Sequence, residues 1–495
     1  MISKVVVVGG GSAGFLAAAT LKAKLPALHV RLIRSKDIGI IGVGEGSTFQ
    51  LTKFLHDYLR INPRKFFEVA RPTFKLGLRF IWGRRPYFNY TFGPGPQETN
   101  VPGLAKSYGY YADADMEDCE ILSSMMSADR AFELVGGRPK FHLSMAYHFE
   151  NERFVRFLED YAMGLGVQII DDTIIEVKQD EAGISGLVLK SGPVETADLY
   201  VDCSGFASLL LGKALGEPFV DYKSSLFCNR AMVGGWERTS EVIKPYTTCE
   251  TMPSGWCWQI EHETRINRGY VYSSDFISDE EAERQFRAAN PKVGPTRIVR
   301  FVTGRYERRW VKNVVAIGNA TGFVEPLEAT ALGLLALQSR HLAQTLLESD
   351  RLPTPTQIAA NNVAHARSWD DIRRFIAIHY KYNDRLDTPF WRACQEETDL
   401  AGAEPIVEYY QENGPAPYWS EMLFGQNDQF RYAGYTALLL GQRVPFRKPH
   451  VPTAAEMQIW QRHRARNRAT AAAALTVRQT LDQIHSPNWK WENQA

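Results

Sequence analysis

"KVVVVGGGSAGFLAAATLKAKL", residues 4–25, is the stretch of sequence that decides the fold. Its valine run predicts a buried strand, its alanine-rich second half predicts a helix, and "HVRLIRS" (29–35) predicts a second strand. The turn between the first strand and the helix satisfies G-x-G-x-x-G, whose glycines permit a tight turn, close approach of a pyrophosphate and close helix packing. We therefore expect an α/β fold with a βαβ unit that binds a dinucleotide at the helix N-terminus. The residues expected to bind it are Gly9, Gly11, Ser12, Ala13 and Gly14.

Arg34 departs from the usual form of this motif. An acidic residue about 20 positions after the glycines usually bonds the ribose hydroxyl, and an arginine stands at that position here. Two interpretations stay open. Either the adenosine end of the ligand is held differently or weakly, or a 2′-phosphate binds there, which would indicate NADP.

The composition is that of a folded, water-soluble protein. The chain has 495 residues, a length sufficient for two or three lobes, and 44% of the residues are hydrophobic. Its 57 Lys and Arg and 56 Asp and Glu nearly balance, so no overall field favours nucleic acid or an anionic membrane. Six cysteines without C-x-x-C spacing argue against a zinc site or a disulfide framework and favour a cytoplasmic protein. We find no secretory signal and no apolar run long enough to span a membrane.

Two further segments predict ligand-binding turns. A glycine-rich loop, "GIIGVGEGST" (39–48), leads into a helical pattern that ends near Leu59. A strand over residues 313–317 is followed by a turn of small residues from Gly318 and by a long helix from about Thr330. The N-terminal amides of that helix would form a second anion site.

The last part of the chain has a helical pattern. Apolar and aromatic residues recur at helical spacing to about residue 484. We therefore expect a body over residues 1–345, which includes a substrate-facing sheet, and a mostly helical subdomain over residues 346–495 packed on it.

A lysine stands inside a predicted strand at residues 74–82. Every second residue there is apolar, as in a strand with one buried face: Phe74, Leu76, Leu78, Phe80 and Trp82. Lys75 belongs to the other face, beside Gly77. Taken alone, this stretch favours a solvated lysine on an exposed strand face.

Seven motifs occur in the order found in one enzyme family. They are "GGGSAGFLAAATL", "IGVGEGST", "FKLGLRFIWG", "AYHFENERFVRFL", "VDCSGF", "GWCWQI" and "IGNATGFVEPLEATALG". Together they resemble the flavin-dependent halogenases of the tryptophan halogenase family over residues 1 to about 440. The resemblance implies a Rossmann-like, FAD-binding flavoprotein monooxygenase body, which receives FADH2 from a separate NAD(P)H-dependent flavin reductase. It also implies oxidation of chloride or bromide by O2 to hypohalous acid, an aromatic small-molecule substrate and a homodimer.

The resemblance implies catalytic roles for two residues. Lys75 matches the lysine that guides hypohalous acid to the aromatic ring, through an N-halo species or a hydrogen bond. Glu328 matches the glutamate near the substrate, which would stabilise the cationic ring intermediate and remove its proton. The alternative for Glu328 is an acid that stabilises the start of a helix. The further FAD-binding residues implied are Gly42, Val43, Gly44, Glu45, Gly318, Asn319 and Leu327.

The halide-binding position departs from the family. In the family, backbone N–H groups of a Ser-Thr-Gly sequence after the glutamate bind the halide, and here this sequence is Ala329-Thr330-Ala331. The halide-binding residues implied are Thr330 and Ala331. The added methyl group leaves the preference between chloride and bromide open.

The residues implied in the substrate pocket argue against free tryptophan as the preferred substrate. Trp256 and Trp258 match the family signature W-x-W-x-I-P, with Glu261 in place of the proline, and would wall the substrate off from the flavin. The other implied pocket residues are Tyr90, Phe92 and Pro326. The histidine of the family's His-Pro-Phe element is missing, and the C-terminal segment that holds the charged ends of tryptophan cannot be aligned. We therefore expect an electron-rich ring without the zwitterion, such as indole or an indole derivative, with phenols and pyrroles as alternatives.

Two other functions stay open at this point. A single-component FAD hydroxylase that uses NADPH would account for Arg34, but not for Lys75 and Glu328 occurring together with the tryptophan pair. A non-catalytic flavin-binding protein would account for the departures at Arg34, Glu261 and Ala331.

Overall fold

The chain, described here by a computed structural model, divides into two compact units that alternate along the sequence. The structure describes residues 1–39, 44–93, 101–113, 116–142, 144–417, 419, 428–447 and 450–491. Unit 1 comprises Met1–Arg71, Phe149–Tyr222 and Phe301–Trp369, and unit 2 comprises Pro72–His148, Lys223–Arg300 and Asp370–Ala495. The expected division has a single boundary after residue 345, and that boundary stays a prediction.

Unit 1 is built on the predicted βαβ unit. β1 (Lys4–Val8), α1 (Ser12–Lys24) and β2 (His29–Arg34) follow in order, and β1 pairs in parallel with β2 and with β14 (Leu199–Asp202). The whole sheet has the order β10-β2-β1-β14-β23-β22. Its other strands are β10 (Gln168–Asp171), β22 (Trp310–Val311) and β23 (Val314–Ala316).

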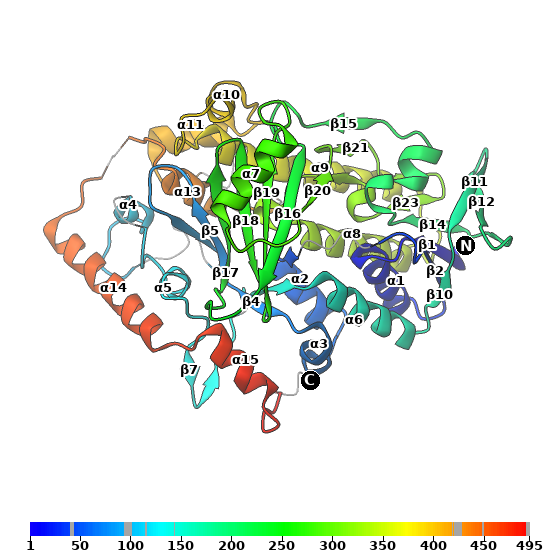
Figure 1. Cartoon of the computed structure of the whole chain (residues 1–495), viewed down its shortest axis with the longest axis horizontal. Coiled ribbons are helices and arrows are strands. Elements are labelled where there is room, and N and C mark those ends of the chain that lie inside the picture. The colour runs from blue at the N-terminus through cyan, green and yellow to red at the C-terminus, as the bar shows by residue number, and fades with distance from the viewer. Residues whose placement is uncertain are drawn as a thin grey trace. The chain divides into compact units, whose positions relative to one another are not determined.

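Both faces of this sheet are covered, which explains the uninterrupted valine run. Val6 and Val8 pack in a core cluster with Leu187 and Leu210. On the helical side, α1 contacts β1 and β2 and packs against α6 (Asn151–Gly164) and α8 (Ala331–Glu348), as Figure 1 shows. A strand buried on both faces carries apolar residues at every position instead of alternating them.

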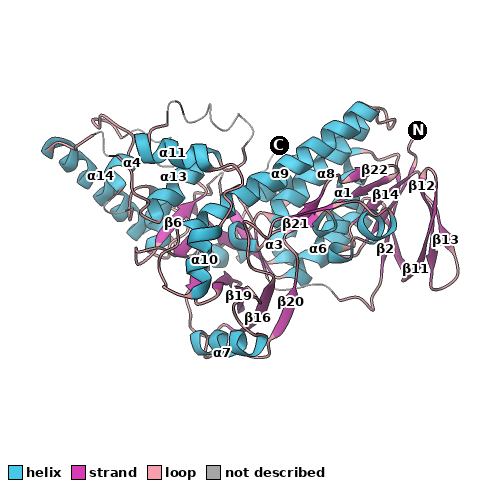
Figure 2. Cartoon of the chain, turned by 90° about the horizontal axis from the view of Figure 1, so that it is seen from above, coloured by secondary structure: helices cyan, strands magenta, loops and turns pink. Residues whose placement is uncertain are grey.

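Shorter elements complete unit 1. A small sheet of β11 (Ile174–Asp180), β12 (Gly183–Leu189) and β13 (Val194–Glu195) stands beside the main sheet in Figure 2. A second small sheet contains β15 (Phe219–Asp221), β21 (Gly304–Tyr306) and β24 (Gly322–Phe323). The remaining elements are β3 (Glu45–Gly46), α2 (Phe49–Lys53), η1 (Phe54–Tyr58), α3 (Pro63–Ala70), η2 (Gly205–Ala207), η3 (Leu209–Ala214), η4 (Gly318–Ala320) and η5 (Pro326–Glu328).

Unit 2 contains a seven-stranded mixed sheet with the order β20-β16-β19-β18-β17-β5-β6, and Figure 1 shows its middle strands in green. The strands are β5 (Gly77–Ile81), β6 (Phe88–Thr91), β16 (Arg230–Glu237), β17 (Tyr246–Met252), β18 (Gly255–Glu261), β19 (Arg265–Tyr272) and β20 (Arg297–Arg300). α7 (Asp279–Ala289) packs on β16 and β19 through Phe286, which lies in a cluster with Met232 and Tyr270.

The predicted helical character after residue 346 is confirmed. α9 (Pro355–Lys381) starts in unit 1 and ends in unit 2. It is followed by α10 (Pro389–Glu397), α11 (Glu404–Asn413), α13 (Arg431–Gly441), α14 (Ala454–Ala473) and α15 (Val477–His485). The other short elements of unit 2 are β4 (Thr73–Lys75), α4 (Gly109–Ala112), α5 (Ile121–Ser127), β7 (Leu134–Val135), β8 (Arg138–Pro139) and β9 (Ala146–Phe149), whose last residue belongs to unit 1.

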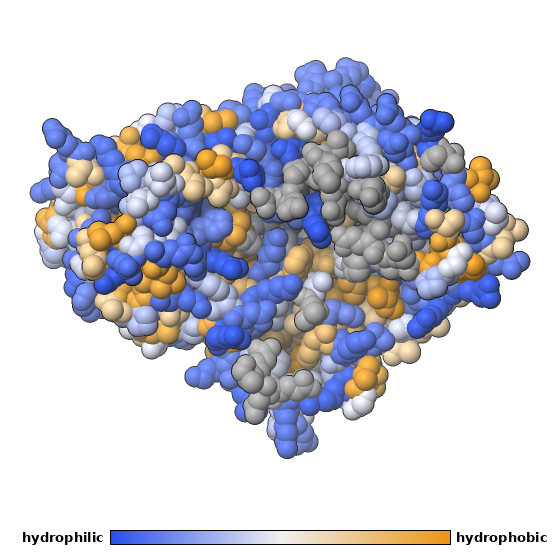
Figure 3. All heavy atoms as spheres, turned by 180° about the vertical axis from the view of Figure 1, so that it is seen from behind, coloured by the Kyte–Doolittle hydropathy of each residue, from blue (hydrophilic) through white to orange (hydrophobic). Residues whose placement is uncertain are grey.

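The surface is mainly hydrophilic where Figure 3 shows it, and hydrophobic residues lie there in small scattered groups. Among the described residues, none of the helices combines the length and the hydrophobicity needed to cross a bilayer.

Candidate functional site

The glycines between β1 and α1 have separate steric roles. A Cβ atom built on Gly14 would lie 1.8 Å from the carbonyl oxygen of Gly9, and one built on Gly9 would lie 2.3 Å from that of Cys203. A Cβ atom on Gly11 would have no neighbour within 4 Å. Gly9 and Gly14 therefore permit close packing, whereas Gly11 borders open space at the start of α1, where backbone N–H groups lack intrahelical acceptors. This end of α1 fits a pyrophosphate.

We predict opposite outcomes for two alanine substitutions in this turn. Gly14→Ala should destabilise the protein by about 3 kcal/mol or more, because the new methyl group collides with a backbone oxygen. Gly11→Ala should leave the melting temperature unchanged but weaken FAD binding about tenfold or more, because the methyl group takes the space of the pyrophosphate. Thermal unfolding and flavin fluorescence quenching measure the two effects. Equal melting temperatures for the two variants would contradict the steric assignment.

The turn after β23 lies beside the same end of α1. A Cβ atom on Gly318 would lie 3.1 Å from the Cβ atom of Ala13, and the Gly318 N–H donates to Gln338 Oε1 of α8 at 2.8 Å. Asn319 follows in η4 and is partly exposed. Two of the predicted cofactor turns, residues 9–14 and 318–319, are therefore brought together in unit 1.

The loop after residue 43 is held by a side chain of α6. The Gly44 N–H donates to Asn151 Oδ1 at 2.9 Å, and the Asn151 amide donates to the Glu45 carboxyl. Burial raises the pKa of Glu45 to about 7, against the opposing effect of the hydrogen bond from Asn151. The predicted ligands Gly42 and Val43 lie outside the described residues.

Glu328 ends the short helix η5 and is 2% exposed. Leu327 is fully buried, whereas Pro326 is exposed. Ala329 follows with φ +53°, a left-handed conformation that turns the chain into α8. The turn leaves Glu328 outside α8, three residues before Ala331, its first helical residue.

The expected halide-binding residues stand where α8 starts. Thr330 is the N-cap residue and is buried, whereas Ala331 is exposed. A Cβ atom on Gly333, in the first turn of α8, would lie 3.0 Å from Thr48 Oγ1 and 3.1 Å from Gln50 Oε1. The chain that follows the second glycine-rich loop therefore packs against the first turn of α8, whose N–H groups are suited to an anion.

Arg34 is neutralised by two carboxylates of unit 1. Its Nη1 atom lies 2.6 Å from Glu159 Oε2 and its Nε atom 2.5 Å from Asp171 Oδ1. These hydrogen bonds raise the pKa of Arg34. A guanidinium group already engaged by two carboxylates is a poor ligand for a 2′-phosphate, so the geometry weakens the NADP interpretation of this residue.

Lys75 is completely buried in unit 2, so the interpretation of a solvated lysine is wrong. The predicted strand is interrupted at Leu76, between β4 and β5, although Leu76 still bonds through its backbone to Pro245 and Phe92. The Lys75 Nζ atom lies 5.2 Å from the centroid of the Phe92 ring. Burying an amine costs free energy, and buried ionisable groups gather at functional sites.

His148 is a buried histidine in β9, the strand paired with β4. Its Nε2 atom lies 2.8 Å from Thr247 Oγ1 and its Nδ1 atom 3.5 Å from Thr73 Oγ1, while the Thr73 hydroxyl donates to the carbonyl oxygen of Glu261. Since the Thr73 proton is already used, Nδ1 carries the imidazole proton and Nε2 accepts from Thr247. Burial, followed by the charge of Lys75, holds the pKa of His148 well below its usual range. His148 is therefore neutral and supports the strand of Lys75 without adding a second charge.

The tryptophan pair lies in the middle of the sheet of unit 2. Trp256 and Trp258 are buried, with ring centroids 6.0 Å apart. A Cβ atom on Gly269, which pairs with Trp258 across β18 and β19, would lie 2.0 Å from that indole ring. The missing side chain of Gly269 therefore makes the space that the ring fills.

Glu261, at the position of the family's proline, forms a buried ion pair. Its Oε2 atom lies 2.5 Å from Arg238 Nη2, and both side chains are at most 4% exposed. Gln259 Nε2 donates to the other carboxylate oxygen at 2.6 Å. The departure at this position therefore has a structural reason, because Glu261 compensates the buried guanidinium group.

The predicted substrate residues of β6 have different surroundings. Phe92 lies beside Lys75, whereas the Tyr90 ring packs at 5.9 Å from the ring of Phe375 and its hydroxyl lies against Gly434. Phe92 is thus the residue of this segment that the structure brings next to the amine.

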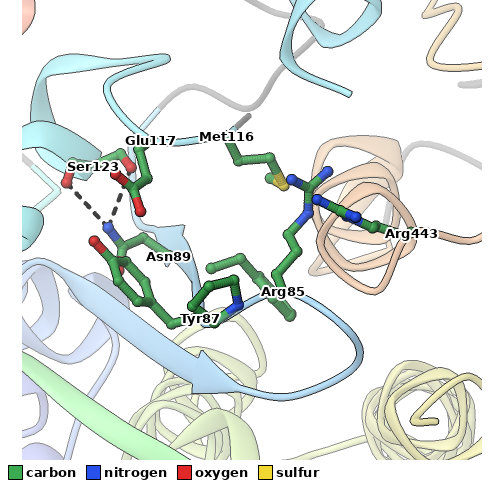
Figure 4. A pocket seen from close by; sticks show the side chains of 9 residues that line it. Arg85, Tyr87, Asn89, Met116, Glu117, Ser123 and Arg443 are labelled. Carbon is green, nitrogen blue, oxygen red and sulfur yellow. Dashed lines mark hydrogen bonds between the residues drawn. The ribbon is translucent and has the colours of Figure 1, made fainter. Parts of the chain in front are cut away.

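A cavity of about 90 Å³ opens near the start of β6 (Figure 4). Asn89 lines it and donates hydrogen bonds to the carbonyl and hydroxyl oxygens of Ser123. The other lining residues are Arg85, Pro86, Tyr87, Phe88, Met116, Glu117 and Arg443. Pockets for drug-sized molecules usually measure about 300 Å³ or more, so we do not assign the aromatic substrate to this cavity.

Sequence reasoning missed three ionisable residues near the predicted ones. Glu325 is fully buried three residues before Glu328, His148 lies beside β4, and the Glu120 carboxyl accepts a hydrogen bond from Thr91. The acidic spacing in "EPLE" (325–328) is a signal for the first. The polar residue inside the otherwise apolar "AYHF" (146–149) is a sequence signal for His148. No feature of the sequence indicates the role of Glu120.

Comparison with known proteins identifies relatives over most of the chain. The profile of the tryptophan halogenase family matches residues 4–458. The tryptophan 7-halogenase RebH of Lentzea aerocolonigenes is 30% identical over 92% of this chain and 93% of its own.

Two solved structures are similar throughout. MibH, a lanthipeptide tryptophan 5-halogenase, is 38% identical with a TM-score of 0.90 and covers 98% of this chain and 94% of its own. Xcc4156, a flavin-dependent halogenase from Xanthomonas campestris, is 29% identical with a TM-score of 0.86 and covers 98% of both chains. They confirm the expected α/β flavoprotein fold. With this fold and with the match over residues 4–458, the chain belongs to the tryptophan halogenase family and is a flavin-dependent halogenase.

Proposed function

We propose that this enzyme uses reduced FAD, O2 and chloride or bromide to halogenate an indole or indole derivative other than free tryptophan. Hypohalous acid would be guided to the ring by Lys75. The observation that carries the proposal is the complete burial of the Lys75 amine beside an aromatic side chain.

The residues of unit 1 fit the cofactor. Gly11 leaves open space at the N–H groups of α1, and Gly318 and Ala13 lie side by side at the same end of the helix. Reduced FAD, when bound, would supply two electrons to O2, and the halide would supply the other two, so that one oxygen atom leaves as water and the other becomes part of hypohalous acid. Because the electrons of the flavin must be replaced in each cycle, a separate NAD(P)H-dependent flavin reductase is the proposed partner.

Lys75 and Glu328 would act on the halogen and on the ring. As a free amine, Lys75 can take the halogen from hypohalous acid and release water; as an ammonium group, it can donate a hydrogen bond to the oxygen of the acid. The carboxylate of Glu328, buried in unit 1, can stabilise the cationic ring and accept its proton. Thr330 and Ala331, at the start of α8, are the proposed halide-binding residues.

The substrate proposal rests on Tyr90 and on one relative. Tyr90 stands where family members that use tryptophan have a histidine, and its ring packs at 5.9 Å from the ring of Phe375. MibH is a lanthipeptide tryptophan halogenase. A tryptophan side chain within a peptide has an indole ring without the zwitterion of the free amino acid, and so meets the same requirement.

A reductase-coupled reaction tests this function. Purified enzyme, FAD, reductase and NADH are supplied with bromide or, separately, with chloride, and products are recognised by their isotope pattern. We expect indole or a tryptophan-containing peptide to be halogenated at least about tenfold more efficiently than free tryptophan. Comparable turnover of free tryptophan and indole would contradict the substrate proposal. A control without reductase separates the halogenase from a hydroxylase, which would oxidise NADPH directly.

A cytoplasmic location and a homodimer are further proposals that rest on the family resemblance alone. The mass of the purified protein in solution tests the second.

A further inference from the structure

Glu120 of unit 2 is a carboxyl group without a cation beside it in the described structure. It immediately precedes α5, and its Oε1 atom accepts a hydrogen bond from the Thr91 hydroxyl. Among the described residues, no Lys, Arg or His forms an ion pair with it. Burial raises the pKa of Glu120 to about 7, against the opposing effect of Thr91. Glu120 is partly buried; moving a carboxylate out of water without a cation costs free energy, and such groups gather at functional sites.

Glu120 and Lys75 meet the same short segment of unit 2. Thr91, the partner of Glu120, precedes Phe92, whose ring lies 5.2 Å from the Lys75 amine. Thr91 also pairs across the sheet with Gly77, two residues after Lys75. The carboxyl group therefore stands along the segment that carries the aromatic ring beside the proposed catalytic amine.

Gly93, which has no side chain, lies beside the second oxygen of Glu120. A Cβ atom built on Gly93 would lie 3.1 Å from Glu120 Oε2 and 2.9 Å from the side chain of Leu122. Among the described residues Oε1 accepts from Thr91 and no donor bonds to Oε2, so Oε2 is the oxygen proposed to accept from a ligand.

The charged groups of the surrounding elements interact elsewhere. On α14, Arg468 pairs with Asp118 at 2.9 Å, and Arg464 donates to the carbonyl oxygen of Glu117. Burial raises the pKa of the neighbouring Cys119 thiol, so it stays neutral. His463 of α14 lies with its Nε2 atom 3.0 Å from the carbonyl oxygen of Cys119. Lys75 of β4 lies over the ring of Phe92.

We propose that Glu120 determines substrate specificity by accepting a hydrogen bond from an N–H group of the aromatic substrate. This inference rests on the proposed function, because it assumes an indole-type ligand beside Lys75. An ionised carboxyl group only accepts hydrogen bonds, and two N–H sources fit: the ring nitrogen of an indole and an ammonium group on its side chain. Both would bind the ionised form of Glu120.

Matched ligand pairs test the proposal. The first pair is indole and 1-methylindole, which lacks the ring N–H group. The second pair is tryptamine and 3-ethylindole, which lacks the ammonium group. For at least one pair, we expect the wild-type protein to favour the N–H ligand about tenfold or more, both in equilibrium binding and in kcat/KM. Methylation makes the indole ring slightly richer in electrons, so ring reactivity alone would favour 1-methylindole.

Glu120→Gln should reduce this preference several-fold, and Gly93→Ala, whose methyl group would cover Oε2, should do the same. Glu117→Gln is the control. It removes the carboxylate of an exposed residue that lies three positions before Glu120. In the wild type the preference should grow from pH 6 to pH 8, since Glu120 ionises around pH 7, and in Glu120→Gln it should not change with pH.

An equal preference in the wild type and in Glu120→Gln at pH 8, or no preference in the wild type, would overturn the proposal. Equilibrium binding does not require turnover. A protein that shows the preference but does not halogenate would therefore disprove the proposed function and leave the role of Glu120 in place.

Discussion

Replacing Lys75 by methionine should lower the turnover of halogenation at least about 10³-fold, near the upper end of the range for losing a group that transfers protons. Methionine has nearly the length and volume of lysine, so the completely buried position on β4 stays filled while the amine is lost. The reductase-coupled reaction measures product formation, and flavin fluorescence and circular dichroism show whether the variant still binds FAD and folds. Normal turnover of Lys75→Met would contradict the catalytic assignment.

A trap for free hypohalous acid sharpens this experiment. If Lys75 guides the acid but does not make it, Lys75→Met should still oxidise halide, and a reactive trap in solution should be halogenated instead of the substrate. Lys75→Arg separates the two roles of the amine, because a guanidinium group stays protonated and donates hydrogen bonds. Partial activity in Lys75→Arg indicates hydrogen bonding to the acid, whereas none in a folded variant indicates an N-halo species.

The parts of the fold that sequence could predict are set by neighbouring residues. The strand, glycine turn and helix over residues 4–25 are recognised because each depends on residues within a few positions of one another. The packing role of Gly14 is likewise local, since its neighbour is the carbonyl group of Gly9. The same holds for the helix that starts at Ala331, because the small residues and the turn before it are contiguous.

The environment of the ionisable residues could not be predicted, because it depends on distant segments. Arg34 is paired with residues 125 and 137 positions away, Glu159 and Asp171, which neutralise the charge that had suggested NADP. His148 comes beside Lys75 only because β4 pairs with β9. Strand alternation alone favoured a solvated face for Lys75, and only the packing of unit 2 around it decides that it is buried.

Replacing Glu328 by glutamine should lower turnover about 10²- to 10³-fold, the range for losing a positioned base or a charge that stabilises a transition state. The side chain is 2% exposed, so its carboxylate acts in surroundings that screen charge weakly. Glutamine keeps the size and removes both the negative charge and the capacity to accept the ring proton. Because halide oxidation does not use this proton acceptor, hypohalous acid should still form. The rate of halogenation of a trap in solution measures formation of the acid, and the rate of halogenation of indole measures the step on the ring.

Glu325→Gln is the matched control for Glu328→Gln, because it makes the same change of charge three residues earlier at another buried position of the same loop. If Glu328 acts on the ring, Glu328→Gln should lose turnover with indole but keep halide oxidation. Glu325→Gln should lose less of its turnover with indole than Glu328→Gln does. An equal loss in both variants would mean that turnover depends on the total charge of the loop. Retained turnover in Glu328→Gln would favour the other interpretation, in which Glu328 is an acid that stabilises the start of α8. That role predicts a lower melting temperature without a change in the ratio of the two rates, so the paired measurements distinguish the chemical role from the structural one.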